Sequence, residues 1–202
     1  VDGVDVYLGM TLTDQNAALV DETIAAVRRS LGPAGSQVTL RDLHLNVWVR
    51  SPHYYANLES EVSPPRDLTD AITQARRVRE RSPSPVDQIE ATYLRLLPAY
   101  LETGRSPVPC RSLSASVFVA TNGDVHPCTV WDRKLGNVRE RSLGDILESA
   151  YAKETRRLVE KDRCPGCWSP CEAFPSIVAS APASLLKRPR DVRRRPSARG
   201  KR

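Results

Sequence analysis

Five cysteines are the residues of this chain whose types and spacing could do chemistry, and all five lie in its second half. Two of them frame a glycine in a C-x12-G-x4-C pattern, and the other three form a C-x2-C-x3-C run. Thiolates are soft, strong ligands for iron–sulfur clusters and for zinc. The candidate metal ligands are therefore Cys110, Cys128, Cys164, Cys167 and Cys171.

Four thiolates complete the shell of a [4Fe–4S] cluster or of a structural zinc ion. Cys110, Cys128, Cys164 and Cys167 would supply them, because the Cys-Pro-Gly-Cys turn can point two sulfurs at one centre. Cys171 is either a fifth thiol at the rim of the site or an alternative ligand. The spacing alone leaves open whether four or all five cysteines ligate.

Two other interpretations of the cysteines have to be weighed. Buried cysteines are common in ordinary cores, but here none precedes position 110. Structural zinc is the stronger alternative, since it also uses C-x2-C turns; a zinc ribbon has two such turns, whereas 17 residues separate the first pair here. The odd number of cysteines excludes a complete disulfide framework, and no secretory signal is visible, so we expect a cytoplasmic protein.

The cysteines need elements to position them, and the first pair is expected on a β-hairpin. The apolar period changes to two over residues 115–129, and Asn122-Gly123-Asp124 is a strong turn signal. Cys110 precedes the outgoing strand and Cys128 lies on the return strand. The hairpin therefore carries both thiols toward one end.

The first hundred residues predict a β–α–β unit followed by helices. A buried strand over 4–12, a helix ending at Gly32-Pro33 and a second strand over 43–49 have the short connections of a parallel pair. Further helices are expected over 67–81, 86–102, 142–149 and 152–161.

Several other residues are candidates for a site, although none is assigned as catalytic. The histidines could be ligands or bases, but a polar strand residue is the simpler interpretation. The paired tyrosines could line a pocket, and the tryptophans that follow cysteines could shield a cluster or pack in a core. These residues are His44, His53, His126, Tyr54, Tyr55, Trp131 and Trp168.

The charge of the chain is concentrated at one end. The formal net charge is +6, yet nine Lys/Arg and one Asp between Lys187 and Arg202 give that stretch +8, which leaves −2 for the rest. We expect 181–202 to be a disordered basic tail with, at most, weak nucleic-acid contact. No run of about 18 apolar residues is present, so no membrane segment is expected.

Within the cysteine region, three stretches resemble one known family. CRSLSASVFVATNGDVHPC (110–128) resembles the opening of the SPASM and twitch domains of radical S-adenosylmethionine (radical SAM) enzymes, where two strands around a glycine turn end in a proline–cysteine pair. LGNVRERSLGDILES (135–149) resembles the segment that follows in that family, and CPGCWSPCE (164–172) resembles its last cysteine cluster.

This resemblance implies an α/β fold and a division of the chain. Residues 1–104 would be the late half of a partial (β/α) TIM-type barrel, and 105–180 a small α+β cluster-binding domain built on the hairpin. It also implies one auxiliary [4Fe–4S] cluster for electron transfer or substrate positioning, and S-adenosylmethionine in the full-length enzyme. Substrates in this family include peptides, sugars and cofactor precursors, and the sequence does not choose among them.

One departure from the family limits the activity expected of this chain. The C-x3-C-x2-C motif, which binds the cluster that cleaves S-adenosylmethionine, is missing, and C-x2-C-x3-C has the reverse spacing. Because the chain begins at Val1, we expect a fragment that is not catalytic alone. Five cysteines favour the shorter, twitch-like form with one cluster. The alternative function is a zinc-stabilised module whose basic tail contacts nucleic acid.

Overall fold

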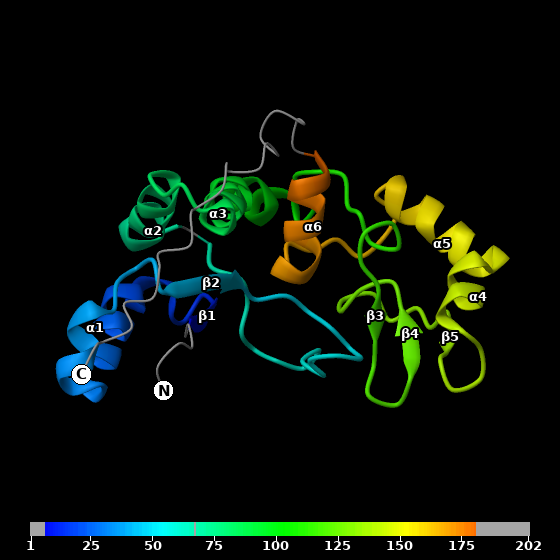
Figure 1. Ribbon diagram of the computed structural model, residues 1–202, viewed down its shortest axis with the longest axis horizontal. Helices are drawn as coiled ribbons and strands as arrows, with labels where there is room; N and C mark the ends of the chain where they lie inside the picture. The colour runs from blue at the N-terminus through cyan, green and yellow to red at the C-terminus, as the bar shows by residue number, and fades with distance from the viewer. Residues whose placement is uncertain (1–6, 67, 181–202) are drawn as a thin grey trace, which may run out of the picture.

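The computed structural model describes residues 7–66 and 68–180 (Figure 1). The basic tail expected over 181–202 lies outside the described residues, as does the start of the strand expected over 4–12. None of the described helices is both long and apolar enough to span a membrane.

The N-terminal elements form one β–α–β unit, as the sequence predicts. Two strands pair in parallel, and their alternate side chains are buried because one face lies against the core. The elements are β1 (Leu8–Leu12), the 3-10 turn η1 (Ala17–Leu19), α1 (Val20–Ser30), the 3-10 turn η2 (Gly32–Gln37) and β2 (Leu43–Val47).

Two helices, α2 (Asp70–Glu80) and α3 (Pro85–Thr103), pack against each other beside this unit. Arg79 on α2 is almost fully buried, where its guanidinium donates to backbone carbonyls, including that of Leu43 at 2.6 Å, and forms an ion pair with Glu90. Burial alone would raise the pKa of Glu90, but hydrogen bonds from His44 and Arg79 lower it below its ordinary value. The pair of Arg79 and Glu90 therefore joins α2 and α3 to the first residue of β2.

The second group of elements is built on the expected hairpin. β3 (Phe118–Val119), β4 (Asp124–His126) and β5 (Gly136–Asn137) form an antiparallel sheet in that order, and β5 is an addition that the sequence did not predict. The turn at Gly123 has φ +90°, and a Cβ there would lie 2.7 Å from Asn137 Oδ1. Glycine is therefore required at this point both by the backbone and by the close approach of β5.

Three more helices complete the fold: α4 (Leu143–Glu148), α5 (Ala150–Glu160) and α6 (Pro170–Ser180). α4 and α5 each begin at a serine whose hydroxyl accepts a backbone N–H, which satisfies one free donor of the first turn. They cover the hairpin over a small separate core made of Leu113, Val125, Leu135, Ile146 and Ala152.

The principal core crosses the predicted boundary at residue 104. α6 returns to pack on α3, so that it lies between the helical part and the hairpin (Figure 1). Side chains from after the boundary join the same buried cluster as the parallel strands: Cys128, Val130, Trp168, Ala173 and Ile177. The division into two domains stays a prediction, but the two parts share one core.

A reciprocal contact between Tyr93 and Trp168 lies in this core. Their rings stack with centroids 5.5 Å apart and planes 6° from parallel, and Trp168 is fully buried. Trp168 Nε1 donates to the Tyr93 carbonyl at 3.1 Å, and the Tyr93 hydroxyl donates to the Trp168 carbonyl at 3.0 Å. The same hydroxyl accepts the N–H of Val47 at 3.0 Å, which links α3, β2 and the start of α6.

We predict that Tyr93→Phe lowers the free energy of unfolding by about 1–3 kcal/mol, because the buried Val47 N–H and Trp168 carbonyl lose their partner. Chemical denaturation measures the change. Tyr54→Phe is the matched control, since Tyr54 is exposed and its hydroxyl makes no hydrogen bond within the described ranges. Equal effects of the two substitutions would contradict the assignment.

Candidate metal centre

Four of the five cysteines line one cavity. Cys110 enters from the segment before the hairpin, Cys128 lies just beyond β4, and Cys164 and Cys167 come from the loop between α5 and α6. The wall is completed by Ser106, Ser112, Val130, Trp131, Val159, Pro165, Gly166, Glu172 and Ala173. The fold thus brings together the thiols of three segments that are far apart in the sequence.

The Cys-Pro-Gly-Cys turn is held against the end of α3. Gly166 has φ +81°, and a Cβ there would lie 2.4 Å from the Gly104 carbonyl oxygen. Arg105 Nη1 donates to the carbonyls of Cys164 at 2.7 Å and Asp162 at 3.1 Å. The turn conformation therefore depends on a glycine and on one guanidinium that reaches back from the end of the helix.

In the chain without a metal, burial favours the neutral form of three of the thiols in the cavity. Burial raises the pKa of Cys110 to about 11 and that of Cys128 to about 12, and it raises the pKa of Cys167 well above its ordinary value. Backbone donors already face the sulfurs: the Trp131 N–H lies 3.2 Å from Cys128 Sγ. Such N–H···S contacts stabilise a thiolate once a cation compensates its burial.

Glu172 is a wall residue that sequence reasoning missed. It is buried in the first turn of α6, and Ser116 Oγ donates to its carboxylate at 2.9 Å. Burial raises the pKa of Glu172, and its charge in turn raises the pKa of Cys128. The only sequence signal was its position directly after Cys171.

The donor set fits an iron–sulfur cluster by its chemistry, since four thiols share one cavity with backbone donors near them. The free space is small, about 20 Å³, which is little more than one water molecule needs. A cluster therefore requires the surrounding loops to move outward. Cys164 and Cys167 lie on a loop, the kind of element that moves at least cost.

The sulfur positions also disfavour a single preformed zinc site. Within the described part of the chain, only His53, His126 and Asp132 form a group of three or more possible ligands whose donor atoms all lie within 4.8 Å of one another. Tetrahedral zinc holds its thiolate sulfurs about 3.8 Å apart. No three cysteine sulfurs of the described residues lie that close together.

Cys171 lies on another surface. It is exposed and lines a separate cavity of about 390 Å³ at the carboxyl ends of β1 and β2. Asn46 Oδ1 and Ser169 Oγ, two wall atoms of this cavity, are buried and have no hydrogen-bond partner among residues 7–66 and 68–180. The short stretch from Cys167 to Cys171 therefore separates two cavities.

The remaining candidate residues have different positions. Trp131 lines the thiol cavity, whereas Trp168 packs in the core against Tyr93 and does not line that cavity. His44 lies on β2, and its Nδ1 is 2.7 Å from Oε1 of Glu90 on α3. Tyr54 and Tyr55 are both about half exposed, and Tyr55 lines the cavity beside Cys171.

His53 and His126 stack with ring centroids 4.3 Å apart. Burial and the neighbouring His53 ring lower the pKa of His126 below its ordinary value. Asp132, which the sequence did not single out, lies beside this pair.

Comparison with known proteins gives a family match, and the matched segment contains the four cysteines that line the thiol cavity. Residues 110–171 match the SPASM family, an iron–sulfur cluster-binding domain. Neither the curated proteins nor the solved structures compared with this chain gave a match. The resemblance of this segment to a SPASM domain is therefore confirmed, and the match supports binding of an iron–sulfur cluster.

Proposed function

We propose that this chain is the C-terminal part of a radical SAM enzyme and that four thiolates, from Cys110, Cys128, Cys164 and Cys167, hold one auxiliary [4Fe–4S] cluster. One observation carries the proposal: these four cysteines line a single cavity, and all four lie within the segment that matches the iron–sulfur domain. The link to radical SAM chemistry rests on the sequence resemblance.

The bound cluster supplies an electron acceptor or donor, or an iron at which substrate is held. The residues of the chain bind and insulate it. Trp131 covers one side and donates its N–H to Cys128, while Arg105 fixes the turn that carries Cys164. Because burial raises the pKa of Cys110, Cys128 and Cys167, each of these three gives up a proton when metal binds.

The substrate cavity in this proposal is the space of about 390 Å³ beside Cys171. It lies where the two parallel strands end, which is the edge at which barrel enzymes of this architecture bind their substrates. Unpaired Asn46 Oδ1 and Ser169 Oγ offer polar contacts to a ligand there. The barrel architecture of residues 1–104 is part of the proposal, and the substrate class stays open.

A zinc-stabilised module is the second candidate, because the small free space among the thiols suits one ion better than a cluster. The separation of the sulfurs and the family match both favour the cluster. Metal analysis distinguishes the two directly, since a cluster brings iron and acid-labile sulfide in equal amounts.

We predict that anaerobically reconstituted protein binds about four irons and four sulfides per chain. Cys167→Ala should lose most of this iron, because Cys167 lines the thiol cavity, whereas Cys171→Ala should keep it. Iron and sulfide assays with absorbance near 400 nm measure the content. The two variants are matched, since they make the same change four positions apart, at the end of the cysteine loop and in the first turn of α6.

Far-UV circular dichroism of both variants without metal checks that a loss of iron is not a loss of fold. The ligand assignment is wrong if Cys171→Ala strips the iron while Cys167→Ala keeps it. Stoichiometric zinc with no uptake of iron by the unaltered chain would reject the proposed function itself.

We also predict that this chain, given S-adenosylmethionine and a strong reductant, forms no 5′-deoxyadenosine above the blank. It lacks the C-x3-C-x2-C motif that the cleaving cluster requires in the family it resembles. Chromatography of the reaction mixture measures the product. Robust formation would show that the five cysteines build a cleaving cluster instead of an auxiliary one.

A further inference from the structure

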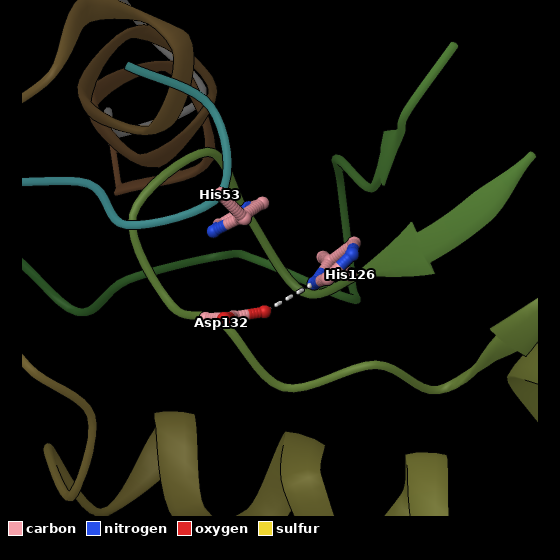
Figure 2. A group of neighbouring side chains, drawn as sticks. All are labelled: His53, His126 and Asp132. Atoms are coloured by element: carbon pink, nitrogen blue, oxygen red, sulfur yellow. Dashed lines mark ion pairs between the residues drawn. The ribbon is translucent and has the colours of Figure 1, made fainter. Parts of the chain in front are cut away.

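A second group of possible metal ligands lies beside the backbone carbonyl of Cys128. His53 belongs to the loop after β2, His126 ends β4, and Asp132 lies in the loop that follows (Figure 2). One donor atom of each lies within 4.8 Å of one donor atom of the others. Segments about seventy residues apart in the sequence thus bring two imidazoles and a carboxylate together.

The orientation of His53 is set by the backbone. Its Nε2 lies 3.1 Å from the carbonyl oxygen of Cys128, and because a carbonyl only accepts, Nε2 must carry the proton and donate. Nδ1 then has a free lone pair, and this atom is buried with no hydrogen-bond partner in the described residues. Histidines that bind metals commonly donate their other ring N–H to a backbone carbonyl in this way.

His126 presents a second buried nitrogen without a hydrogen-bond partner. The residue is 5% exposed, and its Nδ1 makes no hydrogen bond within the described ranges. Asp132 forms an ion pair with this nitrogen, but its Oδ1 is 3.5 Å away, too far for a hydrogen bond (Figure 2). Two imidazole nitrogens without a hydrogen-bond partner are costly to bury, and a bound ion would remove that cost.

We propose that His53, His126 and Asp132 bind one divalent transition-metal ion of the Zn²⁺ class. Imidazole with one carboxylate suits zinc or ferrous iron and disfavours Mg²⁺ and Ca²⁺, which prefer oxygen ligands alone. Three protein ligands leave a fourth position for water. The ion fastens the loop after β2 to the hairpin, directly behind the backbone of Cys128.

The His126 ring has to turn for this ion to bind, because the hydrogen bond to the Cys128 carbonyl holds His53 in place. The two rings now stack at an interplanar angle of 16°, so their in-plane lone pairs cannot point at one common centre. Rotation about the Cβ–Cγ bond of histidine is soft, and Asp132 is half exposed and free to move inward. The competing interpretation is a packed histidine pair beside Phe118 with no metal.

The test uses the full chain with its iron already reconstituted. We expect one equivalent of added Zn²⁺ to remain after gel filtration, with the iron content unchanged. Zinc-edge X-ray absorption should show light-atom ligands at about 2.0–2.1 Å, as opposed to sulfur at about 2.3 Å. Asp132→Asn should bind zinc roughly tenfold or more weakly, since it removes a direct ligand.

Asp21→Asn is the matched control and should bind zinc like the unaltered chain, because Asp21 is an exposed aspartate on α1 whose carboxylate has no hydrogen bond or ion pair within the described residues. His53→Ala is the second ligand variant and should also lose zinc. A sulfur shell around the zinc, or retention of zinc by both Asp132→Asn and His53→Ala, would overturn the proposal. Iron content is read separately, so failure of this site is distinguishable from failure of the cluster.

Discussion

The contact between Tyr93 and Trp168 is the interaction on which the arrangement of the chain depends. It includes ring stacking and two reciprocal hydrogen bonds, and the Tyr93 hydroxyl also holds the N–H of Val47. Trp168 directly follows Cys167, so fixing the indole also fixes the sulfur-bearing loop relative to α3 and β2. Two other hydrogen bonds of this region, from Arg105 to the Cys164 carbonyl and from Ser116 to Glu172, do not reach the parallel strands.

Burying several thiols and a carboxylate in one cavity costs free energy, and the chain without a metal lowers this cost by favouring the protonated forms of these groups. Cys110, Cys128 and Cys167 have pKa values raised by burial, and Glu172 adds a further acid to the same wall. Burying such groups as anions would be far more costly than burying them as neutral acids. A positive metal centre reverses this balance, so occupancy of the site should also stabilise the loops that form it.

The stretch from Cys167 to Cys171 separates two chemical environments. Cys167 lines the narrow thiol cavity, and Cys171 lines the larger cavity at the ends of the parallel strands. Pro170 begins α6 between them, and the helix turns the second sulfur away from the first. In the proposed function this places the cluster and the substrate on opposite faces of one short segment.

The sequence by itself determined the local features: the parallel β–α–β unit, the helices, the Asn-Gly turn and the candidate thiols. These follow from periodicity, turn chemistry and spacing, which act over a few residues. The tertiary structure decided what comes together. It separated Cys171 from the other cysteines, added β5 and Glu172, placed Trp168 in the core and brought His53 to His126 and Asp132. Such meetings depend on how α6 returns to α3, a contact between distant segments that no local pattern encodes.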